Sequence, residues 1–152
     1  ILDCDCSILD SRMTVLGGEF AILLLVQGNW NTLTKLEMHF KRLEQALGLT
    51  IVAKRTESRA PAGDTLPYAV EVVAVNQPGI VHHLASFFAS RSINIEDLVT
   101  RSYSAPHTGT PMFSVNLAIG IPASMHIAML REEFLDFCDE LNLDAVLEPI
   151  KG

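Results

Sequence analysis

A short segment in the middle of the chain has the residue types needed to bind a small ligand at the start of a helix. It consists of Asn76, Gln77, Pro78, Gly79 and Ile80. Proline near the first helical position presets the turn, and Gly79 leaves the backbone uncovered by a side chain. Uncovered N–H groups at a helix N-terminus attract a small carboxylate, with help from the helix dipole. Since the amide of Asn76 both donates and accepts hydrogen bonds, the segment fits the head group of an amino acid.

Asn94 opens the next predicted strand, and we expect it to lie beside this segment as a further ligand contact. An alternative explains the same residues without a ligand, as a capped turn between a strand and a helix. The local pattern leaves both interpretations open.

Other reactive side chains lack the spacing of a catalytic or metal site. His82 and His83 point about 100° apart on a helix, so one is expected to face solvent and the other to pack. Cys4 and Cys6 have no second pair of ligands, and we expect them to be partly buried residues at a helix end. Spacing supports no nucleophile-and-base arrangement, so we expect no enzyme. An exposed polar helix face explains a group of five carboxylates: Glu132, Glu133, Asp136, Asp139 and Glu140.

Composition restricts the class of protein. The 152 residues are 49% hydrophobic and 19% charged, which suffices for a buried core without disulfides. The net charge of −7 disfavours direct binding to nucleic acid. The longest apolar run, residues 20–26, is far shorter than the roughly 20 residues of a membrane span. Three cysteines, an odd number, suit a reducing cytoplasm. Because the sequence begins with Ile1, that residue is not expected to be the biological start.

An internal repeat organises the chain. Two amphipathic helices are predicted, and their apolar positions superimpose at a constant offset of 94. The matched pairs are Leu33 and Ile127, Leu36 and Leu130, Phe40 and Phe134, Leu43 and Phe137, and Leu47 and Leu141. Gly48 falls on Asn142, and both residue types tolerate the left-handed conformation that ends a helix. A stripe and a cap that recur together indicate a duplicated unit.

The second copy predicts a complete β-α-β-β-α-β unit. Its elements are expected at residues 68–75, 80–91, 93–103, 112–119, 124–141 and 143–149. This order is the ferredoxin-like split unit, an α+β fold with two helices on one face of a four-stranded antiparallel sheet. The repeat offset changes from 87 near Ile8 to 93 near Phe20, which places extra residues in the second copy's hairpin, between Tyr103 and Pro111.

The first copy is incomplete. Residues 1–3 correspond to the end of its first helix, and roughly twenty residues of the repeat period have no counterpart upstream. We expect a hairpin that turns at Gly17-Gly18 and a closing strand at residues 49–54. The predicted domains are a first unit at 1–55, a linker at 56–66 and a complete second unit at 67–152.

The second unit resembles the ACT domain, a regulatory module that binds amino acids. The resemblance rests on the turn Asn76-Gln77-Pro78-Gly79-Ile80-Val81-His82 and on Ile93-Asn94-Ile95-Glu96-Asp97-Leu98-Val99-Thr100-Arg101. It also rests on residues 105–113, Arg131-Glu132-Glu133-Phe134 and, in the first unit, Ile8-Leu9-Asp10-Ser11-Arg12-Met13. Two such units in one short chain are similar to the tandem ACT-domain family that represses the glycine cleavage operon.

The resemblance implies a function through protein contact. Members of that family restrain a DNA-binding activator, and glycine relieves the restraint, so we expect a small amino-acid effector and no other cofactor. Carried over by position, the ligand site is Asn76, Gln77, Pro78, Gly79, Ile80 and Asn94. Open sheet edges make a homodimer plausible. Two alternatives stay open: a small metabolic enzyme on a ferredoxin-like scaffold, and a structural pairing module without a ligand.

Overall fold

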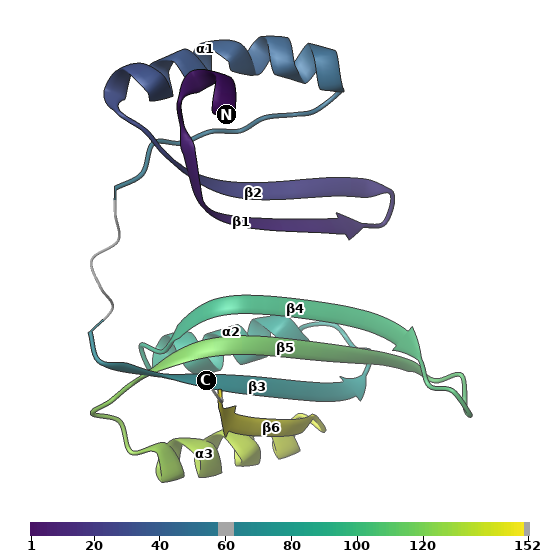
Figure 1. Cartoon of the computed structure of the whole chain (residues 1–152). Helices are drawn as coiled ribbons and strands as arrows, with labels where there is room; N and C mark the ends of the chain where they lie inside the picture. The colour runs from purple at the N-terminus through teal and green to yellow at the C-terminus, as the bar shows by residue number, and fades with distance from the viewer. Residues whose placement is uncertain (58–62, 151–152) are drawn as a thin grey trace. The chain divides into compact units, whose positions relative to one another are not determined.

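A computed structural model describes residues 1–57 and 63–150 (Figure 1). The chain divides into two compact units, Ile1–Ser58 and Arg59–Gly152. Of the linker predicted at 56–66, residues 58–62 lie outside the described residues, and the last two, Thr65 and Leu66, already form part of a strand.

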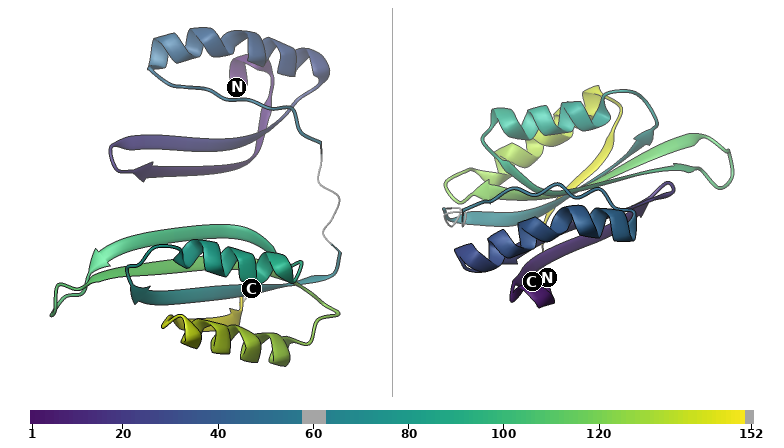
Figure 2. Two further views of the ribbon diagram at one scale, coloured as in Figure 1. Left: turned by 180° about the vertical axis from the view of Figure 1, so that it is seen from behind. Right: turned by 90° about the horizontal axis from the view of Figure 1, so that it is seen from above.

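The second unit has the predicted ferredoxin-like order. Its elements are β3 (Thr65–Val75), α2 (Ile80–Ser90), β4 (Asn94–Ser104), β5 (Pro111–Pro122), α3 (Ile127–Glu140) and β6 (Asp144–Pro149). The strands form one antiparallel sheet in the order β4-β5-β3-β6. Both helices cover the same face of this sheet, as the right view of Figure 2 shows.

The core of the second unit lies between that sheet face and the two helices. Val70 and Val72 of β3 are buried, whereas Glu71 between them is exposed, which is the period-2 alternation of a sheet with one covered face. The rings of Phe88 and Phe134 lie 5.2 Å apart and are fully buried. A contiguous apolar cluster of this kind is the main source of the unit's stability.

The first unit consists of a short 3-10 helix, η1 (Leu2–Cys4), the hairpin β1 (Ser7–Leu16) and β2 (Glu19–Gln27), and the helix α1 (Trp30–Leu47). Gly17 opens the predicted two-residue turn with a φ of 62°. The buried residues are few: Cys4, Cys6 and Leu36. Apolar side chains of the hairpin, such as Leu23 and Met13, are largely exposed.

Backbone details recur in both units at the predicted offsets. Gly48 ends α1 with a φ of 64°, and Asn142 follows α3 with a φ of 55°, so both caps are left-handed as predicted. The pairing of β1 with β2 shifts register between Ile8 and Asp10, and that of β4 with β5 shifts between Ile95 and Asp97. The extra hairpin residues are also confirmed, because Ala105–Thr110 joins β4 to β5.

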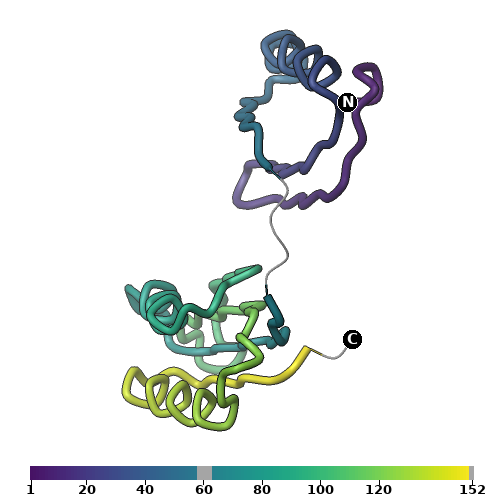
Figure 3. The backbone as a smooth tube through the Cα atoms, turned by 90° about the vertical axis from the view of Figure 1, so that its left-hand side faces the viewer, coloured from purple at the N-terminus to yellow at the C-terminus, as the bar shows by residue number. Residues whose placement is uncertain are grey.

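The predicted closing strand of the first unit is wrong: residues 49–54 form no strand. Its counterpart in the second unit, β6, pairs with β3, the first strand of that unit. No described residue of the first unit forms an equivalent of β3, so residues 49–54 have no neighbour here with which to form a ladder. Figure 3 shows the trace that follows α1 running apart from the hairpin strands.

The structure also gives the helix boundaries. The helix α1 starts at Trp30, since Asn29 caps it by accepting a hydrogen bond from the Thr32 N–H at 2.9 Å. The helix predicted from residue 124 begins at Ile127. Within the described residues, no helix is long and apolar enough to cross a membrane.

Candidate functional site

The candidate ligand segment lies where β3 ends and α2 begins (Figure 1). Asn76, Gln77, Pro78 and Gly79 are exposed, and Ile80 is buried as the first residue of the helix. Gly79 is the N-cap with a φ of 90°, in the left-handed region that favours glycine, and no side chain caps the helix. The first N–H groups of α2 therefore have no side-chain acceptor from the cap residue.

The same segment is fixed in place from both sides. The Asn76 N–H donates to the Pro111 carbonyl at 2.9 Å, which extends the ladder between β3 and β5 by one residue. The Gln77 side chain donates through Nε2 to the Leu141 carbonyl at 3.3 Å, at the end of α3. Within the part of the chain that the structure describes, the Asn76 side chain makes no hydrogen bond. Its amide thus remains available to a ligand.

Asn94 does not lie beside this segment, contrary to the prediction. It pairs with Gly120 at one end of β5, whereas Asn76 bonds Pro111 at the other end. Nine residues of an extended strand span roughly 30 Å. The error has a simple cause: α2 runs back along the sheet after β3 ends, so β4 starts at the opposite end of the sheet.

The two histidines of α2 are both exposed, so the prediction that one of them packs is wrong. Their rings lie 5.7 Å apart at 65°. A Cβ at Gly79 would stand 3.3 Å from the His83 Nε2 atom, so His83 borders the ligand segment. Among residues 1–57 and 63–150, no group of three or more His, Cys, Asp or Glu side chains is placed to hold a metal ion.

The cysteines are free thiols that contribute to packing. Cys4 is the last residue of η1 and Cys6 lies two residues after it, and both are buried. The Cys4 Sγ atom lies 3.9 Å from the His39 Nδ1 atom. Burial in α3, with Asp139 nearby, raises the pKa of Cys138 from its ordinary value of 9.0 to about 12. The Cys138 thiol is therefore neutral and unreactive near neutral pH.

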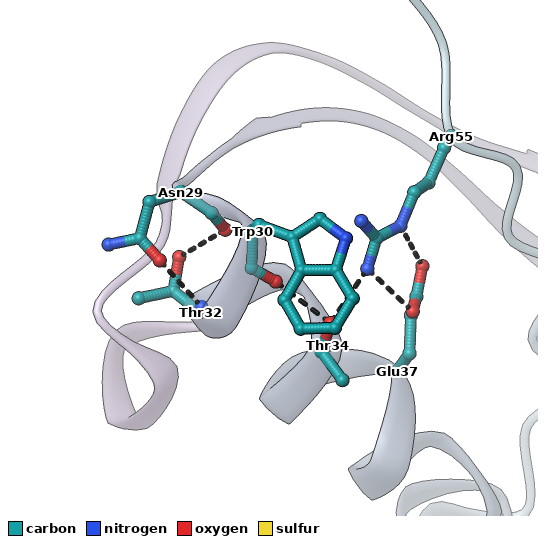
Figure 4. Close-up of polar contacts among 6 residues, drawn as sticks. All are labelled: Asn29, Trp30, Thr32, Thr34, Glu37 and Arg55. Carbon is teal, nitrogen blue, oxygen red and sulfur yellow. Dashed lines mark hydrogen bonds and ion pairs between the residues drawn. The ribbon is translucent and has the colours of Figure 1, made fainter.

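A polar cluster on the first unit was missed by sequence reasoning (Figure 4). Arg55 donates two hydrogen bonds to the Glu37 carboxylate, at 2.9 and 3.0 Å, and one to the Thr34 Oγ1 atom at 2.9 Å. The Arg55 guanidinium also lies 5.6 Å from the centre of the Trp30 ring. The hydrogen bond from Arg55 lowers the pKa of Glu37. Through these contacts Arg55, in the segment that follows α1, is held against that helix. Residues that meet from a helix and an irregular segment show no periodic spacing, so the sequence carries no signal for it.

The five carboxylates of α3 are exposed, as predicted for a solvated helix face. One of them, Glu133, accepts hydrogen bonds from Arg91, the residue directly after α2, at 3.0 and 3.2 Å. The side chains of these two residues are 53% and 32% exposed, so this is a surface pair that links the two helices.

Comparisons with known proteins identify relatives over most of the chain. The sequence profile of the ACT domain matches residues 1–54, which is the first unit. The glycine cleavage system transcriptional repressors of Escherichia coli (strain K12) and Shigella flexneri are each 30% identical over 142 residues, covering 93% of this chain and 75% of the relative.

Solved structures share the same fold across both units. A crystal structure provisionally assigned as a glycine cleavage system transcriptional repressor matches with a TM-score of 0.75 at 26% identity, over 99% of this chain and 85% of the other. An unknown protein from Galdieria sulphuraria matches with a TM-score of 0.76 at 24% identity, over the same shares of the two chains. The second of these supports the fold alone.

Proposed function

The chain belongs to the family of the glycine cleavage system transcriptional repressors, and we propose that it senses a small amino acid and represses glycine cleavage genes by binding a DNA-binding activator protein. The observation that carries this proposal is the 30% identity over 93% of the chain to repressors of that name. A regulatory role follows from membership of the family. We propose in addition that repression acts through an activator protein and that glycine is the effector.

The segment Asn76–Ile80 is the proposed site for the amino acid. Its support is local: an unused side-chain amide at Asn76, an uncapped helix start at Gly79, a backbone hydrogen bond from Asn76 to Pro111 and a side-chain hydrogen bond from Gln77 to Leu141. The helix N–H groups suit the ligand's carboxylate, and the Asn76 carbonyl oxygen suits its ammonium group.

Asn94 can belong to the same site only if it comes from another copy of the unit, because within one unit it lies at the far end of the sheet. Its inclusion therefore goes together with the proposed homodimer. The exposed edges of β4 and β6 are the parts of the sheet open to such pairing.

The size of the effector limits its affinity. At a ceiling of about 1.5 kcal/mol per non-hydrogen atom, glycine gains at most roughly 7.5 kcal/mol, which corresponds to a micromolar dissociation constant. Such an affinity suits a sensor of an abundant metabolite. To act as a switch, glycine must also bind the free protein and the complex with unequal affinity.

A protein partner fits the charge of the chain better than DNA. The net charge of −7 opposes the approach of a phosphate backbone and favours a cationic protein surface. We place the protein in the cytoplasm, where the three free thiols persist in reduced form.

A reporter assay tests the proposal directly. In an Escherichia coli strain that lacks its own repressor, a reporter under the glycine cleavage promoter is measured with and without expression of this chain. We expect expression to lower the reporter signal, added glycine to restore it, and the purified chain to leave promoter DNA unshifted in a gel. Direct binding to the promoter, or a signal that does not change with the chain, would contradict the proposal.

A further inference from the structure

The outer surface of the second unit has a groove between α2 and α3, on the side away from the sheet. Its volume is about 610 Å³. On the α2 side it is lined by His83, Ser86 and Ser90, and on the α3 side by Glu133, Asp136 and Glu140. Each set is spaced i, i+3, i+7, which places its members on one face of its helix. The groove is therefore built by two facing helix stripes.

The floor of the groove is aromatic. The rings of Phe87 and Phe137 lie 4.9 Å apart and at 34° to each other between the two helices. Phe87 is only 6% exposed, so its ring is held firmly by the core. Phe137 is half-buried, and the exposed part of its ring offers apolar contact to aliphatic side chains that enter the groove.

One end of the groove already shows how it accommodates a cation. The Arg91 guanidinium lies 3.7 Å from the centre of the Phe87 ring and donates two hydrogen bonds to the Glu133 Oε2 atom. The aromatic face and the carboxylate thus hold the same positive group.

The rest of the acidic wall is not neutralised. Asp136 and Glu140 form no ion pair with any residue that the structure describes, and Asp139 and Glu132 add negative charge on the same helix. Of the described residues that line the groove, Arg91 alone is a lysine or an arginine, and it is already paired with Glu133. Two carboxylates beside an aromatic floor are complementary to a segment that carries both positive and aliphatic side chains.

We propose that this groove is the surface through which the second unit binds a cationic, amphipathic segment of a protein partner. Lysine or arginine side chains pair with Asp136 and Glu140, and their aliphatic stems and neighbouring apolar residues cover Phe137. The identification of that partner with the regulated protein rests on the proposed function. The groove and the ligand segment meet at His83, but the acidic wall lies on α3, whereas the ligand segment precedes α2.

Charge reversal with a matched control tests the groove. The double variant Asp136→Lys/Glu140→Lys reverses the acidic wall, and Asp144→Lys/Glu148→Lys makes the same chemical change on exposed residues of β6 with the same spacing. The probe is a labelled synthetic helical peptide with arginine on one face and leucine on the other, and binding is followed by fluorescence anisotropy. Circular dichroism verifies that both variants fold.

We expect the peptide to bind the unmodified chain and the β6 variant alike, and the groove variant about tenfold more weakly. Binding should also weaken as salt is added. Equal weakening in both variants, or no binding to the unmodified chain, would overturn the proposal. So would sedimentation data in which only the groove variant loses a homodimer, because the occupant would then be a second copy.

Calorimetry with glycine on the same variants separates the two proposals. A groove variant that loses the peptide and still binds glycine supports both the groove and the sensor. A chain that binds the peptide at the groove but releases no heat with glycine retains the groove proposal and contradicts the proposed sensing function.

Discussion

Asp5 and Ser92, 87 positions apart in the chain, have nearly the same left-handed backbone conformation, with φ values of 56° and 55°. The hydrogen bonds around them recur as well. The Cys4 and Cys6 N–H groups both donate to the Ile1 carbonyl, as the Arg91 and Ile93 N–H groups do to the Phe88 carbonyl. The short helix η1 therefore repeats the last turn of α2, which ties the first unit to the ACT architecture of the second.

Truncation of equivalent core rings should affect the two units differently. Phe134 is fully buried, whereas its counterpart Phe40 is half-buried because the first unit has fewer elements around it. We expect Phe134→Ala to lower the free energy of unfolding of the second unit by about 3–5 kcal/mol, and Phe40→Ala to cost its unit about 1–2 kcal/mol. Urea denaturation followed by amide NMR signals from each unit measures both. Equal losses would contradict this account.

Replacement of Gly79 should strain the start of α2. An alanine there must keep a φ of 90° and bring its Cβ to 3.3 Å from His83. We expect Gly79→Ala to destabilise the second unit by about 1–2 kcal/mol. The control is Gly63→Ala, where a Cβ meets nothing within 4 Å. If thermal melts gave the same stability for both variants, the left-handed turn would be refuted.

Alkaline unfolding should depend on Cys138. Its pKa is raised to about 12 in the folded chain by burial, so folding favours the neutral thiol. This contribution is fully present below the ordinary pKa of 9.0 and is lost as the pH rises from there toward 12. We expect the stability of Cys138→Ala to fall less steeply with pH in this window, measured by chemical denaturation. Parallel pH profiles for the two proteins would disprove the burial of an ionisable thiol.

Trp30 should report on the ion pair between Arg55 and Glu37. It is the single tryptophan of the chain, and the Arg55 guanidinium lies over its ring. The pKa of Glu37 is lowered by the hydrogen bond from Arg55, so the pair persists until the pH falls below the ordinary value of 4.5. We expect a change in Trp30 fluorescence in that acid range, absent in Glu37→Gln. The control Glu19→Gln should retain it, and a transition that survives Glu37→Gln would argue against the pairing.

Local patterns predicted most of the fold. The helices around Leu36 and Leu130 and their left-handed ends at Gly48 and Asn142 follow from side-chain period and backbone tolerance, which depend on near neighbours in sequence. The repeat then placed the hairpins and the extra residues before Pro111, because two copies of one unit share their strand order.

Features that depend on contacts between residues far apart in the chain could not be predicted from the sequence. Residues 49–54 have the composition of a strand, but a strand needs a neighbour, and no described residue of the first unit forms an equivalent of β3. Asn94 follows α2 closely in sequence, yet the direction in which that helix runs puts it at the other end of the sheet. Contacts such as Arg55 with Glu37 arise only once the chain has folded.

Calorimetric titration of glycine into the purified chain tests the central claim most directly, with Asn76→Ala and the control Asn116→Ala, which removes an exposed asparagine of β5. The account predicts heat of binding with a micromolar or weaker dissociation constant. It also predicts about a tenfold loss of affinity in Asn76→Ala, because a hydrogen bond to a charged group is lost, and no loss in Asn116→Ala. No heat with glycine or related amino acids, or an affinity that Asn76→Ala leaves unchanged, would contradict it.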